Sequence, residues 1–422
     1  METTQANEPS AAEDLAPLKS CLTARASTEL DASQDTQQLA SRVGSAEQSN
    51  TSIIYGRQWI LKLFRRLQPG ENPDVEIGRY LTEVARFQRI APFLGEISIV
   101  PANGEKTTVA MLQGLVANEG DGWQWFLTEL AGFYASVATL PAPHESPTAS
   151  FVHEREPISE ALEHAGPSLE AAALLGRRTA EMHLALAAAT DDPAFAAEPL
   201  TPADLASDAR RIDVQITSTL EALKAKLSTL KDFTADDAGL LLSRRINLFA
   251  RANAITAFTP TGQRIRIHGD YHLGQTLRTG GTVTERGDFV LLDFEGEPAR
   301  PLAERRQKQS PLKDVAGMIR SFSYAAYTGL DQYLTDHPEA PRTTDSKNLG
   351  AWAILWENSA SAEFLRAYRE VIAANPVLLP SPEQSQLLLG AYLLEKALYE
   401  RLYELNNRPA WLRIPLAGIL SL

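Results

Sequence analysis

The 422-residue sequence contains a single cysteine, Cys21, so it can form neither an intrachain disulfide nor a cysteine-based zinc site. This cysteine usage fits a reducing compartment, and we expect a cytoplasmic protein. No apolar run is long enough to cross a bilayer, and the polar, acidic residues 1–14 lack the features of a secretion signal. Acidic side chains outnumber basic ones by 53 to 40, which gives a net charge of −13. Nucleic acids and anionic membranes favour a basic face, so neither is expected as a partner.

At this length the chain can form two or three domains with a substantial core. Residues 1–43 are rich in small and polar side chains, so we expect a disordered start and then at most a short helix or a poorly defined strand. The next stretch is β-rich, with a hairpin predicted at 53–64 and further strands at 97–100 and 107–112. Residues 113–119 would then form a hinge whose backbone groups could bind an adenine edge.

From residue 123 onward, apolar side chains recur mainly at helical spacing. Helices are expected at 124–137, 168–188, 202–230, 235–257, 312–327, 349–374 and 382–405. His183 lies on the apolar face of one of them. We interpret it as a core histidine whose hydrogen bonds are satisfied, rather than as a ligand.

One stretch combines a strand pattern with side chains that can carry chemistry. Residues 264–267 alternate charged and apolar side chains, which predicts a half-buried strand, and a His-Gly-Asp tripeptide ending at Asp270 follows it. Gln275 comes five residues after Asp270. Asp293 follows a second apolar run at 289–292. Turn residues separate the two runs, so we expect the loop and the second carboxylate on neighbouring strands.

These residue types at this spacing fit phosphoryl transfer, which needs a carboxylate to deprotonate the attacking hydroxyl and oxygen ligands to hold Mg²⁺ against the nucleotide phosphates. Asp270 fits the first role, and Gln275 with Asp293 fits the second, at the spacing of a protein-kinase catalytic loop with Gln in place of Asn. Asp293-Phe294-Glu295 stands where kinases carry Asp-Phe-Gly, and its glutamate argues against kinase-style flipping. A His-Gly-Asp tripeptide alone is also typical of a turn that closes a strand. The ordered set favours an ATP- and Mg²⁺-dependent kinase.

Lys62 is the candidate for a cation that binds the nucleotide phosphates. It alternates with Leu61 and Leu63 on a predicted strand, and a helix start follows at Asn72, a good N-cap residue. In kinases, a strand lysine is held by a glutamate of the next helix, so Glu76 is the expected partner. The alternative is that this lysine belongs to a solvated strand face.

Several segments together resemble the bacterial maltokinases: residues 47–52, 60–67, 118–123, 293–323 and the HGDYHLGQ stretch at 268–275. The resemblance runs from about residue 44 to the C-terminus. It implies transfer of the γ-phosphate of ATP to the anomeric hydroxyl of maltose, which gives maltose 1-phosphate for α-1,4-glucan synthesis. It also implies a possible partnership with trehalose synthase, and the two-lobed α+β fold, similar to protein kinases, that the aminoglycoside phosphotransferases share.

The resemblance assigns a role to each matching residue. Asp270 is the base, Gln275 and Asp293 hold Mg²⁺, and Lys62 pairs with Glu76. Ser49, Asn50 and Thr51 cover the phosphates. The acceptor sugar is expected to bind a C-terminal helical part and two histidines beside the base: Lys396, Tyr399, Glu400, Arg408, His268 and His272. The alternative for the C-terminal part is a helix whose apolar side chains are buried and whose polar ones are merely exposed.

The expected organisation is a lead-in at 1–43, a small antiparallel β nucleotide lobe with its hinge at 44–120, and a mainly helical C-lobe at 121–422. The lead-in is shorter than the N-terminal cap of the maltokinases. Two alternatives stay open: a kinase of the same fold acting on an aminoglycoside or another sugar, and a catalytically silent module of a trehalose synthase assembly. Retention of Asp270, Gln275, Asp293 and Lys62 together argues against the silent module.

Overall fold

The computed structural model describes residues 21–30, 39–44, 50–102, 104–144, 159–227, 232–280, 287–338, 345–407 and 413–421. The chain divides into two compact units. Unit 1 comprises Met1–Ala117 and Leu292–Arg306, and unit 2 comprises Asn118–Leu291 and Gln307–Leu422. The sequence-based division had placed 292–306 in the C-lobe. The structure assigns this segment to unit 1, where Asp293 contacts Lys62.

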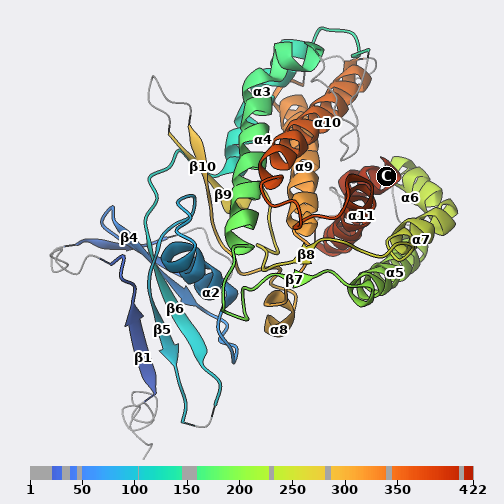
Figure 1. Ribbon diagram of the computed structural model, residues 1–422. Coiled ribbons are helices and arrows are strands. Elements are labelled where there is room, and N and C mark those ends of the chain that lie inside the picture. Colours follow the sequence, from blue (N-terminus) through green and yellow to red (C-terminus); the bar gives the residue numbers. More distant parts are fainter. Residues whose placement is uncertain are drawn as a thin grey trace, which may run out of the picture. The chain divides into compact units, whose positions relative to one another are not determined.

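Unit 1 is built on a six-stranded antiparallel sheet with the strand order β1-β5-β6-β4-β3-β2 (Figure 1). The strands are β1 (Leu22–Ala26), β2 (Ser41–Val43), β3 (Asn50–Tyr55), β4 (Trp59–Phe64), β5 (Phe93–Ile99) and β6 (Thr107–Gly114). The hairpin predicted at 53–64 is confirmed, with Ile53 opposite Leu61. Both β1 and β2 come from the predicted lead-in. All their residues are exposed, so they lack the apolar face by which a strand is recognised in sequence.

A buried helix, α2 (Pro73–Arg79), packs on this sheet. Its N-cap Asn72 accepts a hydrogen bond from the backbone of Asp74, as the sequence predicted. The helix continues into a π-helical turn at Tyr80–Val84. The apolar core beneath α2 joins one helix residue to three strand residues, namely Val75, Phe64, Phe93 and Met111. A short helix, α8 (Leu302–Arg305), also belongs to unit 1.

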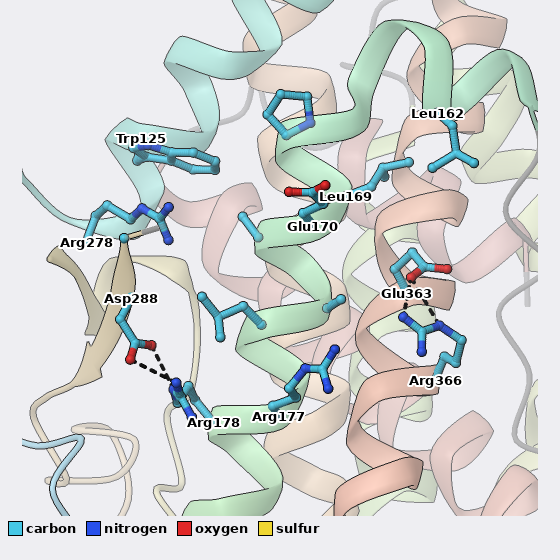
Figure 2. A pocket seen from close by; sticks show the side chains of 15 residues that line it. Trp125, Leu162, Leu169, Glu170, Arg177, Arg178, Arg278, Asp288, Glu363 and Arg366 are labelled. Atoms are coloured by element: carbon cyan, nitrogen blue, oxygen red, sulfur yellow. Dashed lines mark hydrogen bonds and ion pairs between the residues drawn. The ribbon is translucent and has the colours of Figure 1, made fainter. Parts of the chain in front are cut away.

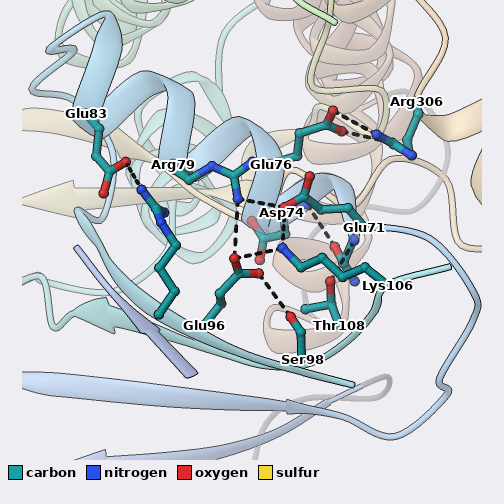
Figure 3. Close-up of polar contacts among 12 residues, drawn as sticks. Glu71, Asp74, Glu76, Arg79, Glu83, Glu96, Ser98, Lys106, Thr108 and Arg306 are labelled. Carbon is teal, nitrogen blue, oxygen red and sulfur yellow. Dashed lines mark hydrogen bonds and ion pairs between the residues drawn. The ribbon is translucent and has the colours of Figure 1, made fainter. Parts of the chain in front are cut away.

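An ion-pair network ties both ends of α2 to the sheet (Figure 3). Arg79, at the end of the helix, lies 2.6 Å from the Glu71 carboxylate, just before the helix start. Lys106 bridges Glu71 at 2.9 Å and Glu96 of β5 at 2.8 Å, and the Ser98 hydroxyl donates to Glu96. Burial opposes ionisation of Glu71, but Arg79 and Lys106 outweigh it and lower the pKa of Glu71 to about 2. The network therefore fixes the orientation of α2 against β5.

Unit 2 is mainly helical. Its helices are α3 (Gly122–Val137), α4 (Ser159–Leu186), α5 (Pro202–Lys226), α6 (Asp232–Ser243), α7 (Arg245–Ala254), α9 (Leu312–Asp336), α10 (Asp345–Ile372), α11 (Pro382–Asn407) and α12 (Arg413–Ser421). The helix predicted at 235–257 is in fact two helices, because the backbone breaks at Arg244. No helix in the described ranges is both long and apolar enough to span a membrane.

Three helices of unit 2 share an aromatic core. Phe126 of α3 lies with its ring centroid 5.6 Å from that of Phe322 of α9 and 6.0 Å from that of Trp356 of α10. α4 runs beside α10 (Figure 1). At Gly176 of α4, a Cβ atom would lie 2.1 Å from the Phe364 carbonyl oxygen of α10. Only glycine permits so close a contact between the backbones of the two helices.

The strand predicted at 264–267 requires correction. Only Gln263–Arg264 forms a strand, β8, which pairs with β7 (Glu198–Pro199). Ile265, Arg266 and Ile267, which follow this strand, are all buried, so charged and apolar side chains do not alternate between an exposed and a buried face. The Arg266 guanidinium lies 5.4 Å from the centre of the Phe195 ring, a cation–π contact that stabilises the charge there.

The two predicted runs, 264–267 and 289–292, do not pair with each other, because β8 pairs with β7 and the second run pairs with a strand that follows Gln275. β9 (Thr276–Thr279) and β10 (Asp288–Leu291) form an antiparallel hairpin. A short 3₁₀ turn, Leu273–Gln275, leads into β9. The segment with the candidate base Asp270 therefore precedes one strand of the hairpin, and Asp293 follows the other.

Candidate active site

The loop that carries Asp270 is held by one buried carboxylate. Asp314, in the first turn of α9, accepts hydrogen bonds from the backbone N–H groups of His268 at 2.8 Å and Gly269 at 2.9 Å. Gly269 has a φ of +83°, a conformation that favours glycine. Burial alone would raise the pKa of Asp314, but His183, His268 and the backbone donors reverse this and lower it. An ionised carboxylate thus anchors the backbone directly before Asp270.

The same face of α9 meets the loop at two further points. Gly317 lies so close that a Cβ atom would be 2.6 Å from the Tyr271 carbonyl oxygen. The Ser321 hydroxyl accepts a hydrogen bond from Leu273 N at 3.1 Å. Positions 314, 317 and 321 recur at helical spacing and so lie on one side of α9. Sequence reasoning missed this support, because an aspartate in a first helical turn is also typical of a surface helix start.

Asp270 forms an ion pair with Lys396 of α11, with a distance of 3.1 Å between Nζ and Oδ1. Burial tends to raise the pKa of Asp270, but Lys396, then His272 and His268, lower it below its ordinary value. The Asp270 side chain remains 24% exposed. An ionised, accessible carboxylate on a fixed loop has the properties of a general base.

The predicted acceptor residues of α11 lie together. Lys396 Nζ is 5.2 Å from the centre of the Tyr399 ring. Glu400 accepts a hydrogen bond at 3.0 Å from Nε of the buried Arg320 of α9, with which it forms an ion pair. Lys396 and Glu400 are only 19% and 12% exposed, so the polar side of this helix is not simply a solvated face. Arg408 lies outside the described residues.

The two histidines and Gln275 occupy defined places around the loop. His268 is buried, with its ring centroid 5.1 Å from that of Tyr271. His272 caps the 3₁₀ turn, and its Nδ1 accepts a hydrogen bond from Gly274 N at 3.1 Å. Gln275 ends that turn directly before β9. Contact of either histidine with an acceptor stays a prediction, as does the metal role of Gln275.

In unit 1, Lys62 lies between two carboxylates. Its Nζ is 3.1 Å from Asp74 Oδ2 and 3.1 Å from Asp293 Oδ1. Asp74 is fully buried on α2, and its other oxygen accepts a hydrogen bond from Phe294 N at 2.9 Å. Asp74 therefore holds both the lysine and the backbone beside Asp293.

This arrangement corrects the expected partner of Lys62. The α2 carboxylate that accepts its hydrogen bond is that of Asp74, whereas Glu76 forms a bidentate pair with Arg306, with both distances 3.0 Å. Residues two apart on a helix do not face the same side, so Asp74 and Glu76 meet different neighbours. The sequence showed both acidic residues but not which side of α2 faces β4.

Three carboxylates of unit 1 could hold a cation. Oxygen atoms of Asp74, Asp293 and Glu295 all lie within 4.8 Å of one another. Asp293 has a φ of +66°, which is uncommon for a residue other than glycine. Burial first, and then the charges of Asp74 and Asp293, raise the pKa of Glu295 to about 7. Crowded carboxylate oxygens fit a hard divalent ion such as Mg²⁺.

The three residues predicted to cover the phosphates are described only in part. Asn50, buried at the start of β3, donates to Glu295 Oε1 at 2.7 Å. Thr51 lies next to it on β3, opposite Leu63. Ser49 lies outside the described residues. The structure thus brings Lys62, Asn50 and Asp293 together in unit 1, and Asp270, Lys396 and Glu400 together in unit 2.

Unit 2 also contains a cavity of about 600 Å³ between α3, α4, α10 and the β9–β10 hairpin (Figure 2). Among the described residues, its lining includes none of the predicted site residues. Two of its arginines are engaged by carboxylates, as in the Arg178–Asp288 pair at 2.7 Å and the Arg366–Glu363 pair at 2.8 Å. None of the described residues of the loop at 268–275 lines this cavity.

Comparison with known proteins places this architecture among kinases. No protein-family profile matches the sequence. The chain is 24% identical over 371 residues to a glucosamine kinase of Streptacidiphilus jiangxiensis. This alignment covers 87% of the chain and 70% of that protein. It is 26% identical over 384 residues to a glucosamine kinase of Mycolicibacterium smegmatis. That alignment covers 90% of the chain and 78% of the relative.

Among solved structures, a glucosamine kinase in complex with glucosamine, ADP and inorganic phosphate aligns with a TM-score of 0.68. The alignment covers 95% of the chain and 82% of that structure, at 21% sequence identity. The chain therefore has the fold of this kinase. The expected α+β fold, with an antiparallel sheet and a mainly helical remainder, is confirmed.

Proposed function

We propose that the protein transfers the γ-phosphate of ATP to a hydroxyl group of a small sugar, in a reaction that requires Mg²⁺. The observation that carries the proposal is the Asp270–Lys396 pair on a loop anchored by Asp314. It provides a carboxylate that is ionised at neutral pH and still accessible. The kinase fold and the sequence similarity to glucosamine kinases add independent support.

In the proposed reaction, Asp270 accepts the proton of the sugar hydroxyl as its oxygen forms a bond to the γ-phosphorus. The bond between that phosphorus and the β–γ bridging oxygen breaks, and ADP leaves. Lys62 stabilises charge on the phosphate oxygens. The bound Mg²⁺ would neutralise phosphate charge and would be held by Asp293, with Gln275 as the further ligand predicted from sequence. Asp74 holds Lys62 and the backbone beside Asp293 in place.

Two acceptors have support of different kinds. Maltose, phosphorylated at its anomeric hydroxyl, is supported by the resemblance of several segments to maltokinases. With maltose, the product would feed α-1,4-glucan synthesis beside a trehalose synthase. Glucosamine is supported by the names of the curated relatives.

Acidic groups on α10 and α11 add a physical reason for a cationic amino sugar. Burial raises the pKa values of Glu400 and Glu357, even though Arg320 lies beside both and counteracts the effect. Glu404, also buried, accepts a hydrogen bond from the Tyr324 hydroxyl at 3.4 Å. An ammonium group would compensate this concentration of carboxylates better than a neutral disaccharide would.

The test is release of ADP from ATP and Mg²⁺ with maltose, glucosamine, glucose, trehalose or kanamycin as the acceptor. Turnover selective for maltose or glucosamine supports the sugar-kinase proposal and identifies the acceptor. Preference for kanamycin would replace it with an aminoglycoside kinase. Absence of turnover with every acceptor would favour the silent module. Asp270→Asn is the control for sugar-dependent turnover.

A further inference from the structure

Two buried polar side chains of unit 2 have no part in the proposed reaction. His183 of α4 and Tyr368 of α10 are both completely buried. His183 Nδ1 lies 2.9 Å from the Tyr368 hydroxyl, and its Nε2 lies 3.1 Å from Asp314 Oδ2. The sequence predicted that this histidine is a satisfied core residue, and its burial and hydrogen bonds confirm that prediction. They also show that its partner is the carboxylate that anchors the catalytic loop.

The direction of these hydrogen bonds follows from the chemistry of the groups. An ionised carboxylate only accepts, so His183 Nε2 donates to Asp314. In the neutral ring Nδ1 is then an acceptor from the Tyr368 hydroxyl, and in the protonated ring Nδ1 donates to the hydroxyl oxygen. In both forms the contacts run from Tyr368 through His183 to Asp314. Each member fixes the orientation of the next, and each is buried with its partner, which avoids the cost of an unsatisfied polar group.

The hydrogen bonds continue from Asp314 into the loop. Oδ2, which accepts from His183, also accepts from His268 N, and Oδ1 accepts from Gly269 N. Asp270 is the next residue. The loop is also held from α4 directly, because the Thr179 hydroxyl lies 3.0 Å from the Tyr271 hydroxyl. Thr179 and His183 are four residues apart and so lie on the same face of α4.

We propose that His183 is a positioning residue, which together with Tyr368 fixes the Asp314 carboxylate in the orientation that keeps Asp270 beside Lys396. The proposal rests on the proposed function, in which Asp270 is the base. It predicts that loss of His183 changes the geometry and ionisation of Asp270 as well as the stability of the unit. A histidine that serves only as core packing would affect stability alone.

The test uses His183→Asn and Tyr368→Phe, with Tyr134→Phe as the matched control. Tyr134 is likewise a fully buried tyrosine, but its hydroxyl donates to the Ala326 carbonyl at 2.7 Å, away from the loop contacts. His183→Asn should lower kcat by roughly 10- to 100-fold, because misplacement by about 1 Å can cost about 10² in rate. Tyr368→Phe should lower it by about 3- to 10-fold, since it removes one orienting hydrogen bond. KM for ATP should change little in either variant.

The pH profile separates positioning from packing. The groups that lower the pKa of Asp270 are Lys396, His272 and His268. If the loop drifts from Lys396, the pKa of Asp270 rises, so the acid limb of kcat/KM should move to higher pH in both test variants. Tyr134→Phe should keep the wild-type limb even though it is also less stable to urea.

A second readout does not depend on activity. Amide hydrogen exchange at His268 and Gly269 should accelerate at least about tenfold in His183→Asn and Tyr368→Phe, and not in Tyr134→Phe, because weaker anchoring opens these two hydrogen bonds more often. Unchanged exchange and an unchanged acid limb in both folded test variants would overturn the proposal, as would equal effects in the control. If His183→Asn fails to fold, Tyr368→Phe decides. If the wild type phosphorylates no sugar, the proposed function fails, while the exchange data still test the anchoring.

Discussion

The carboxylate of Asp270 and the ammonium group of Lys396, 126 residues apart in the chain, lie 3.1 Å from each other. The pair joins the loop after β8 to the middle of α11. It keeps the candidate base ionised and places it next to the helix that carries the predicted acceptor residues.

Removal of the base should reduce the rate while leaving nucleotide binding intact. Asp270→Asn keeps the size of the side chain and does not alter unit 1. General-base catalysis typically contributes roughly 10²–10⁴ in rate, so kcat should fall by about that factor. The Kd for ATP, measured by calorimetry, should remain close to that of the wild type. A variant with nearly normal kcat would show that another group is the base.

Removal of Lys396 should shift the pH dependence of kcat/KM. Lys396 makes the largest contribution to lowering the pKa of Asp270, whereas burial acts to raise it. In Lys396→Met the pKa of Asp270 therefore rises, and the acid limb of kcat/KM should shift to higher pH. Lys308→Met is a suitable control, because Lys308 pairs with Glu198 and should leave the limb in place. An unshifted limb in Lys396→Met would contradict the assignment.

The two acidic residues of α2 should differ in their effects. Asp74→Asn weakens the hold on Lys62 and should raise KM for ATP by about tenfold, since hydrogen bonds to charged groups contribute roughly 1.5–3 kcal/mol. Glu76→Gln should have a smaller effect, because Glu76 binds Arg306 instead of orienting the phosphates. Steady-state kinetics of the two variants provides the comparison. A larger defect in Glu76→Gln would restore the sequence-based pairing with Lys62.

The proposed metal ligands should respond to the Mg²⁺ concentration. Asp293→Asn removes an anionic oxygen, which hard divalent ions prefer, so it should raise the Mg²⁺ requirement and be partly rescued by excess metal. Gln275→Ala should show a milder form of the same defect. Asp270→Asn should not be rescued. Titration of Mg²⁺ for all three variants measures this, and rescue of Asp270→Asn alone would mean that base and ligand are reversed.

The network around Glu71 should make unit 1 sensitive to acid. The folded pKa of Glu71 is about 2, below its ordinary value of 4.5. The ionised form therefore contributes its full stabilisation above about pH 4.5 and loses it as pH falls toward 2. Glu71→Gln should lower the free energy of unfolding by about 1–3 kcal/mol at pH 7.

The loss in Glu71→Gln should shrink between pH 4.5 and pH 3. Urea denaturation at several pH values is the measurement. Glu29→Gln is the control, because the Glu29–Arg86 pair is exposed and such pairs contribute little. A loss in Glu71→Gln that does not depend on pH would argue against an ionised Glu71.

Local patterns in the sequence predicted much of the fold. The Asn72-Pro73 start identified α2. β-branched and aromatic residues on both arms of a Gly56-Arg57 turn identified the β3–β4 hairpin, and helical periodicity found most helices of unit 2. These signals are local, because capping, turn formation and amphipathicity each depend on residues close in sequence. The exposed strand β1 gave no such signal, since it buries no face.

The candidate site divides in the same way. Strand patterns and spacing singled out Asp270 and Asp293 as candidates, and their roles stay predictions. Asp314 was not, although it binds a loop 45 residues away, because its role arises from tertiary packing of α9. The choice between Asp74 and Glu76 failed for the same reason: sequence shows that both are acidic, while the side of α2 that faces Lys62 is set by the sheet beneath it.

The most direct test of the central claim is ³¹P NMR of a reaction that contains the protein, ATP, Mg²⁺ and either maltose or glucosamine. The account predicts a new phosphomonoester resonance, formed together with ADP, for at least one of the two sugars and absent from the same reaction with Asp270→Asn. Conversion of ATP to inorganic phosphate alone, or an undiminished phosphomonoester signal with Asp270→Asn, would contradict it.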